Sequence, residues 1–136
     1  GFGEITAYDL WEKYEYKSAH IGMTQATIER YGLDDIVTLR YGDIFSWLEE
    51  PAGCDLLHID ISNDGDKLYN VLDRIEQIHC FDPVILFEGG TAQRDKVEWM
   101  VKYDRKPIAS IKERFDYKVV DERYPGLSMY GGSNNG

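Results

Sequence analysis

The chain has 136 residues, of which 43% are hydrophobic and 13% aromatic, and its formal net charge at pH 7 is −10. This length and apolar content predict one folded domain and exclude an intrinsically disordered chain. The negative charge argues against binding to nucleic-acid phosphates or to anionic membranes, and no apolar run is long enough to span a bilayer.

The first part of the chain predicts a strand, a helix and a second strand. Residues 5–10 are expected to form the first strand, and residues 16–31 a helix that Gly32 ends. The second strand is expected over residues 36–41, and residues 46–50 form at most one helical turn before a Pro-Ala-Gly break. This order is typical of parallel strands joined by a helix.

The second part continues the alternation. A strand is expected over residues 54–60, followed by a helix over 66–80 whose apolar residues recur at helical spacing. Residues 84–87 form a continuous apolar run, which is typical of a strand buried on both faces of a sheet. The remaining predicted elements are helices over 92–103 and 107–115 and an antiparallel hairpin of strands 117–122 and 127–130.

These elements predict an α/β fold, in which a mostly parallel sheet carries helices on both faces and ends in the antiparallel hairpin. Strand 84–88 is expected inside the sheet and strand 36–41 towards an edge. The domain is expected to cover residues 1–130, and residues 131–136, which are glycine and asparagine around one serine, are expected to form a flexible tail.

Four predicted strands stop at or just before a carboxylate, at Asp9, Asp43, Asp60 and Glu88. In an open parallel sheet, ligands bind outside the carboxyl ends of the strands. These acids therefore predict a site for hydroxyl groups, a positively charged group or a metal, with Asp9, Asp43 and Asp60 along one rim. Each acid could instead be a turn residue that simply ends its strand.

The same residues resemble the class I S-adenosylmethionine-dependent methyltransferases, from the second strand of that family to its last. ITAYD places Asp9 where the family has the acid that bonds the ribose hydroxyls. RYGDIF supplies Gly42, Asp43 and Ile44 where the family's Gly-Asp pair borders the adenine. CDLLHID places Asp60 beside the methionine part of the cofactor or the substrate. The resemblance implies a three-layer Rossmann-like sandwich and S-adenosyl-L-methionine as cofactor.

The family's Gly-rich turn after its first strand has no clear counterpart. Gly1-Phe2-Gly3-Glu4 lies too close to Asp9 for a helix to fit between them, so we interpret it as a loop before the family's second strand. The first strand, which lies between the second and fourth in the family, is then expected upstream, and we expect the chain to be either an N-terminally incomplete domain or a degenerate member of the family. We expect this chain alone to be marginally stable or to form a homo-oligomer through the gap, and to bind the cofactor weakly.

The activity implied by the resemblance is methyl transfer to a small-molecule acceptor, with oxygen as the accepting atom. Asp60 and Glu88 are the predicted catalytic residues, because either carboxylate could take the proton of the acceptor. His58 alternates with Asp60 along one strand and is expected to face the core. The acidic charge and the lack of an Asn-Pro-Pro-aromatic motif argue against a nucleic-acid acceptor.

A divalent metal is an alternative that the sequence does not favour. Asp60, Asp64, Asp66 and Glu88 offer the oxygen ligands that Mg²⁺ or Ca²⁺ prefers. However, metal-dependent members of the family carry an Asp-Asn pair where this chain has Glu88-Gly89. Asp64 and Asp66 are also typical residues for capping the following helix.

Two other classes of protein stay open. A nucleotide-dependent oxidoreductase also uses an acid after its second strand for the ribose, but its Gly-x-Gly-x-x-Gly turn is equally absent. A non-catalytic or incomplete Rossmann-like domain would carry the same acids as strand ends. The two cysteines, Cys54 and Cys80, are expected to be free buried thiols, which indicates a reducing, cytoplasmic location.

Overall fold

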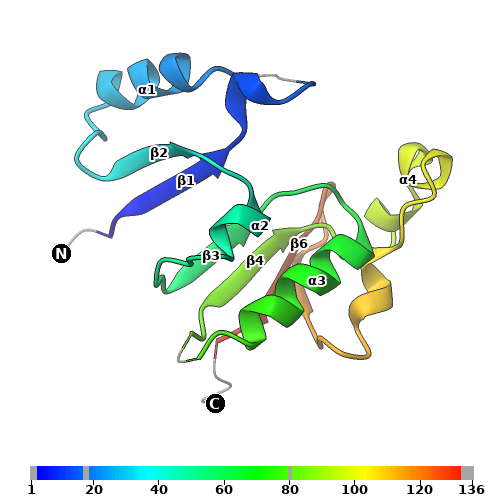
Figure 1. Ribbon diagram of the computed structural model, residues 1–136. Coiled ribbons are helices and arrows are strands. Elements are labelled where there is room, and N and C mark those ends of the chain that lie inside the picture. The colour runs from blue at the N-terminus through cyan, green and yellow to red at the C-terminus, as the bar shows by residue number, and fades with distance from the viewer. Residues whose placement is uncertain (1–2, 17–18, 80, 133–136) are drawn as a thin grey trace. The chain divides into compact units, whose positions relative to one another are not determined.

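The computed structural model describes residues 3–16, 19–79 and 81–132. The chain forms two compact units, Gly1–Pro51 and Ala52–Gly136. Within the described residues it is a mixed α/β structure with two sheets, one of two strands and one of four (Figure 1). None of the described helices is long and apolar enough to cross a membrane. Cys54 is a free, half-buried thiol, whereas Cys80 lies outside the described residues.

The first unit is built on a pair of parallel strands. Its elements are β1 (Ile5–Asp9), the 3-10 helix η1 (Trp11–Lys13), α1 (Ile21–Arg30), β2 (Val37–Tyr41) and α2 (Ile44–Trp47). β1 and β2 pair with Ile5 opposite Val37 and Asp9 opposite Tyr41. Both predicted strands and their parallel direction are therefore confirmed.

Helix α1 is shorter than predicted but ends where the sequence placed its end. Gly32 has a φ of +64°, a conformation that glycine adopts at no steric cost. The backbone N–H of Leu33 donates to the carbonyl of Ile28 at 3.0 Å, which closes the helix as a Schellman motif. The start of the helix differs from the predicted one. Residues 11–13 form the separate 3-10 helix η1, and α1 begins at Ile21, directly after His20.

The second unit contains a mixed sheet in the order β3-β4-β6-β5. Its elements are β3 (Leu56–Ile59), α3 (Gly65–Glu76), β4 (Val84–Glu88), η2 (Arg94–Lys96), α4 (Glu98–Lys102), η3 (Ile108–Ile111), β5 (Lys118–Asp121) and β6 (Leu127–Gly131). β3 runs parallel to β4, and β6 pairs antiparallel with both β4 and β5. The predicted inner position of strand 84–88 and the closing hairpin are confirmed. β6 includes Gly131, and residues 133–136 of the expected tail lie outside the described residues.

The core of this unit lies between α3 and one face of the sheet. The apolar stripe of α3 is almost fully buried, and so are the side chains that point from β3 and β4 to the same side: Leu68, Val71, Leu72, Ile75, Ile59, Ile85 and Phe87. Phe87 also packs edge-to-face on the ring of Tyr117, with the ring centroids 5.3 Å apart. The helical spacing in the sequence therefore identified the buried face of α3.

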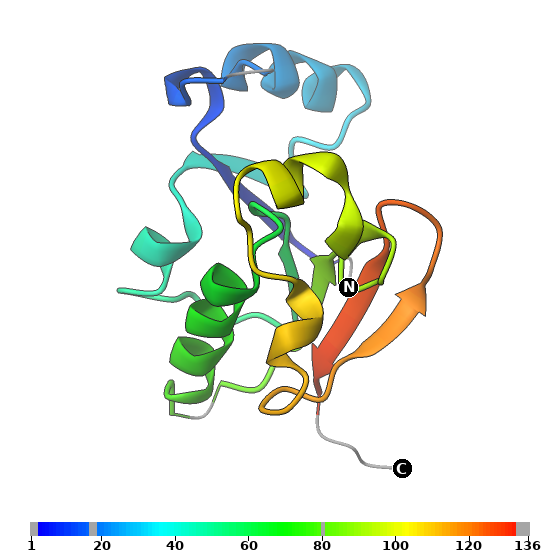
Figure 2. The ribbon, with the colours of Figure 1, turned by 90° about the vertical axis from the view of Figure 1, so that its right-hand side faces the viewer.

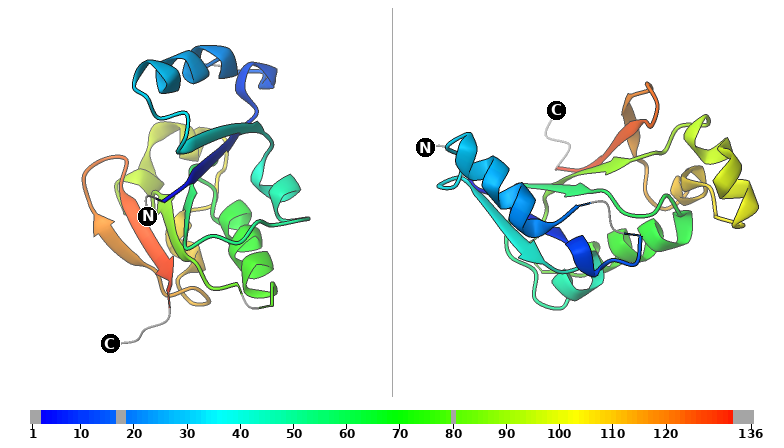
Figure 3. Two further views of the ribbon diagram at one scale, coloured as in Figure 1. Left: turned by 90° about the vertical axis from the view of Figure 1, so that its left-hand side faces the viewer. Right: turned by 90° about the horizontal axis from the view of Figure 1, so that it is seen from above.

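The expectation that strand 84–87 is buried on both faces is wrong for the described residues. Ile85 and Phe87 are buried, but Val84 and Leu86 on the opposite face are only half-buried. Figures 2 and 3 show the helices of this unit on one side of its sheet. Within residues 52–79 and 81–132 the second face therefore has no helical layer, and the predicted cover on both faces is not seen there.

The predicted single sheet is also replaced by two. Within the described residues, β1 pairs only with β2, and β3 pairs only with β4. The predicted helix over 92–103 divides into η2 and α4, because Val97 has an extended backbone with ψ of 149°. The helix expected over 107–115 is reduced to the single 3-10 turn η3.

A turn of two glycines leads the chain away from the end of β4. Gly89 and Gly90 have φ angles of +95° and +84°. The hydroxyl of Ser128 donates to the Gly89 carbonyl at 2.8 Å, and the hydroxyl of Tyr117 donates to the Gly90 carbonyl at 2.9 Å. A Cβ atom on Gly90 would lie 2.4 Å from the Ser128 Oγ. Only glycine fits this turn.

Gly90→Ala is expected to destabilise the second unit by about 2–4 kcal/mol, because it combines a positive φ with a steric clash. Urea denaturation followed by circular dichroism measures the loss. The control is Gly53→Ala in the same unit, where a Cβ meets no atom within 4 Å, so its stability should stay close to that of the wild type. Equal stability of the two variants would contradict the packing described for the turn.

Candidate functional site

The structure brings two of the predicted cofactor-binding segments together. Asp9 ends β1, and Gly42 follows the last residue of β2. The backbone N–H of Gly42 donates to the carbonyl of Asp9 at 3.0 Å. Because β1 and β2 are parallel, Asp9 and the Gly42-Asp43 pair lie at the same edge of their sheet.

The side chains at this edge are exposed and only partly engaged. One carboxylate oxygen of Asp9 accepts the backbone N–H of Trp11 at 2.9 Å. One oxygen of Asp43 accepts the N–H of Ser46 at 2.8 Å and so caps α2, whose first residue is the half-buried Ile44. Within the described residues the second oxygen of each carboxylate makes no hydrogen bond, so both acids can still accept one from a ligand.

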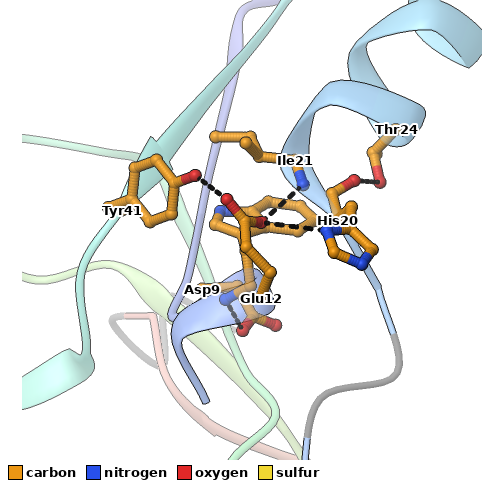
Figure 4. A network of polar contacts seen from close by, with 7 residues as sticks. Asp9, Glu12, His20, Ile21, Thr24 and Tyr41 are labelled. Carbon is orange, nitrogen blue, oxygen red and sulfur yellow. Dashed lines mark hydrogen bonds and ion pairs between the residues drawn. The ribbon is translucent and has the colours of Figure 1, made fainter.

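Sequence analysis missed the acid that organises this part of the unit, which is Glu12. Its Oε1 accepts a hydrogen bond from the Tyr41 hydroxyl, and its Oε2 accepts the backbone N–H of Ile21 at 3.1 Å. The Nδ1 of His20 lies 3.9 Å from the same Oε2. Figure 4 shows Glu12 between the side chain of Tyr41 and the start of α1. Glu12 therefore ties η1 to β2 and to α1.

These contacts stabilise the charged form of Glu12. The Tyr41 hydroxyl contributes most, followed by the Ile21 N–H, and together they lower the pKa of Glu12 to about 2. The same hydrogen bond raises the pKa of Tyr41. Because the pKa of Glu12 is lower in the folded than in the unfolded chain, its contribution to stability is fully present above about pH 4.5 and disappears as the pH falls through 2.

The second candidate region is a cavity in the second unit. It has a volume of about 430 Å³ and lies beside the end of β4 and the turn that joins β5 to β6. The residues that line it are His58, Glu88, Asp121, Arg123, Tyr124, Pro125, Gly126 and Leu127. Glu88, predicted as catalytic, therefore lies in the wall of a cavity large enough for a small molecule.

Arg94 holds Glu88 in place, and sequence analysis did not identify it. Its Nη2 donates to Glu88 Oε1 at 2.9 Å, and its Nη1 donates to the Tyr124 hydroxyl at 3.4 Å. The guanidinium also lies over the rings of Trp99 and Tyr124, at 5.2 and 5.6 Å from their centroids. The side chain of Arg94 is only 11% exposed. Arg94 therefore connects the end of β4 to α4 and to the turn at Tyr124.

Asp60, the other predicted catalytic acid, lies at the same end of the sheet as Glu88. The pairing of β3 and β4 ends with Ile59 opposite Phe87, and the two acids are the next residues on each strand. Asp60 is exposed, does not line the cavity, and makes no hydrogen bond or ion pair within the described residues. Its placement on one rim with Asp9 and Asp43 stays a prediction, because those acids belong to the other unit.

The expectation that His58 faces the core is wrong. Its side chain is exposed and lines the cavity, whereas its neighbour Ile59 is 3% exposed. In β3 it is His58 and Ile59 that point to opposite faces; residues two apart along a strand, such as His58 and Asp60, lie on the same side, so the predicted alternation of these two is wrong. His58 shares its face with Leu86 and Glu88, the face that carries no helix in this unit.

Three of the four carboxylates considered as metal ligands are paired with a basic side chain, and Asp60 is the exception. Asp64 caps α3 and accepts from Arg105 at 3.2 Å, Asp66 lies 2.9 Å from the Nζ of Lys106, and Glu88 is bonded to Arg94. Within the described parts of the chain, no three side chains of His, Cys, Asp or Glu are grouped so that they could hold a metal ion.

No protein-family model matches this chain. A search of curated proteins also found no match.

The first prediction from this region concerns the Glu12–Tyr41 hydrogen bond. Following the carboxyl carbon of Glu12 by NMR during an acid titration should give a pKa of about 2 in the wild type. Tyr41→Phe should raise that pKa towards 4.5, because the variant removes the largest cause of the shift. Asp121, whose pKa is also lowered to about 2, by its own bonds to Arg123, should titrate unchanged in the variant. An ordinary Glu12 pKa in the wild type would show that the hydrogen bond does not form.

The second prediction concerns Arg94. Arg94→Lys keeps the positive charge, but a lysine cannot donate to both Glu88 and Tyr124 and also stack on two aromatic rings. We therefore expect the unfolding free energy to fall by about 1–3 kcal/mol. Arg123→Lys is the matched control, because the side chain of Arg123 is 89% exposed and such pairs contribute about 0–1 kcal/mol. Chemical denaturation of both variants makes the comparison. A smaller loss for Arg94→Lys than for Arg123→Lys would exclude Arg94 as the anchor.

Proposed function

We propose that this chain is the greater part of a class I methyltransferase domain that transfers a methyl group from S-adenosyl-L-methionine to an oxygen of a small molecule. The observation that carries the proposal is the joined ends of β1 and β2. There Asp9 and the Gly42-Asp43 pair, from segments that resemble the family's ribose and adenine motifs, share one edge of a parallel strand pair.

The strand pairing supports the proposal as well. The family places its first strand between its second and fourth, and the corresponding strands here, β1 and β3, do not pair within the described residues. The other neighbours follow the family's order, since β3 pairs with β4 and the closing hairpin lies beyond β4. We infer a Rossmann-like sandwich of three layers in which one further strand pairs with β3 on its free edge.

The residues present fit the cofactor at its ribose. Asp9 is exposed and keeps one carboxylate oxygen without a partner in the described structure, so it can accept hydrogen bonds from two neighbouring hydroxyls. Asp43 and Ile44 would lie beside the adenine, and Asp60 towards the methionine part. The cofactor supplies a methyl group on a positively charged sulfur, and what it needs from the protein is alignment and the exclusion of water.

On the acceptor side, Glu88 is the residue that we favour for holding the reacting hydroxyl. Its Oε1 is fixed by Arg94, and its Oε2 makes no hydrogen bond in the described structure. A carboxylate fixed in this way can accept the hydroxyl proton as the oxygen is methylated. Asp60 is the second candidate for that proton, because it follows β3 at the same end of the sheet.

The test is calorimetric binding of S-adenosylhomocysteine to this chain and to variants of Asp9. Asp9→Ala should weaken binding about ten- to a hundredfold, since a hydrogen bond to a charged group contributes about 1.5–3 kcal/mol. Asp9→Asn keeps an oxygen that accepts the Trp11 N–H, so the local turn is preserved while the charge that the ribose hydroxyls would bond is removed. This variant should therefore also bind more weakly than the wild type. Asp35→Ala, an exposed acid before the opposite end of β2, is the control and should bind like the wild type.

The outcomes separate the classes of protein. Binding of a nicotinamide dinucleotide in place of S-adenosylhomocysteine would favour an oxidoreductase. Binding of neither ligand, by this chain or by a chain extended upstream through the expected first strand, would leave a non-catalytic domain as the better description. If the ligand binds, Asp60→Asn and Glu88→Gln should each lower methyl transfer more than cofactor affinity.

A further inference from the structure

The cavity beside Glu88 has a wall composition that points to the class of molecule it binds. Its carboxylates belong to Glu88 at the end of β4 and Asp121 at the end of β5. These two positions flank Leu127, because Leu127 pairs with Glu88 on one side and with Asp121 on the other. The cavity therefore has two acids separated by an apolar side chain.

Both acids are already neutralised by the protein. Glu88 accepts a hydrogen bond from Arg94. Asp121 accepts hydrogen bonds from both the Nε and the Nη2 of Arg123, and the distance from Nε to Oδ1 is 3.0 Å. A cationic ligand would have to compete with an arginine for each carboxylate, and an anionic ligand would have to draw Arg123 away from Asp121. The wall therefore offers no unpaired acid or arginine to a charged ligand.

The paired carboxylates can still accept hydrogen bonds from hydroxyl groups. A carboxylate has room for about four hydrogen bonds, and Arg94 occupies one position on Glu88. The Tyr124 hydroxyl and the His58 imidazole add further polar groups to the same cavity. Carboxylate acceptors form stronger hydrogen bonds than neutral ones, so these positions favour a ligand that is rich in hydroxyl groups.

The rest of the wall is apolar. Tyr124, Pro125 and Leu127 lie together on the turn and at the start of β6. Tyr124 and Pro125 are exposed in the free protein. An aromatic ring beside a proline suits the C–H face of a saturated ring, and the volume of about 430 Å³ admits one or two such rings.

We propose that this cavity binds a neutral, polyhydroxylated ring of the saccharide class, with hydroxyls on Glu88 and Asp121 and the apolar face of the sugar against Tyr124 and Pro125. That this sugar is the methyl acceptor rests on the function proposed above. The binding itself does not require the cofactor.

The experiment is an NMR titration of the ¹⁵N-labelled chain with neutral methyl glycosides, with glucuronate as the anionic probe and glucosamine as the cationic probe. Millimolar methyl glycosides of the gluco, galacto, manno and rhamno series should shift the amides of residues 123, 124, 126 and 127. Glu88→Gln should weaken the best of them about five- to tenfold, because a charged acceptor becomes neutral. Tyr124→Leu on the exposed turn should weaken it by a similar factor. The control is Asp116→Asn, an exposed acid outside the cavity wall, which should bind like the wild type.

Three results would overturn the proposal. Glucuronate could bind most tightly and lose its affinity in Arg123→Ala, which would mean that Arg123 recruits an anion. Glucosamine could bind most tightly, which would mean that the carboxylates act as cation ligands. The third such result is that no probe shifts the amide signals of residues 123, 124, 126 and 127. Binding of S-adenosylhomocysteine is measured on the same sample, so failure of the sugar and failure of the methyltransferase proposal are seen separately.

Discussion

Parallel pairing of neighbouring strands is the constraint on which both candidate regions depend. Because parallel strands end at the same edge of a sheet, residues that follow them become neighbours however far apart they are in the chain. In the first unit this places Asp9 beside Gly42, with a backbone hydrogen bond between them. In the second unit it places Asp60 and Glu88 at one end of β3 and β4. The acids are therefore grouped by strand direction, before any side chain makes a contact.

In each unit, one charged side chain connects several elements of the fold. Glu12 connects η1, β2 and α1 through Tyr41 and the Ile21 N–H. Arg94 connects the end of β4, the turn at Tyr124 and the ring of Trp99. The two differ in burial, since the side chain of Glu12 is 29% exposed and that of Arg94 is 11% exposed. The contribution of Arg94 to stability should therefore be less sensitive to salt.

The second unit buries one face of its sheet and leaves the other open, and this decides where its cavity lies. Ile85 and Phe87 face α3, whereas Leu86 and Glu88 point to the opposite side with His58, Leu127 and Met129. An apolar strand such as β4 is better suited to cover on both faces. Among the described residues, no strand pairs with β3 on the side away from β4, so this edge and the open face are where the unit has the most to gain from a further element or a ligand.

The sequence by itself determined the elements whose signals are local. Helical spacing predicted α3 and its buried stripe, Gly32 predicted the end of α1, and alternation around a turn predicted the hairpin, because each signal depends on residues close together in the chain. It also selected Asp9, Gly42, Asp43 and Glu88 as strand-end residues. Tertiary structure alone decided the partners of Glu12 and Glu88 and the exposure of His58. Tyr41 lies 29 residues from Glu12, and strand alternation identifies two faces without specifying which one α3 covers.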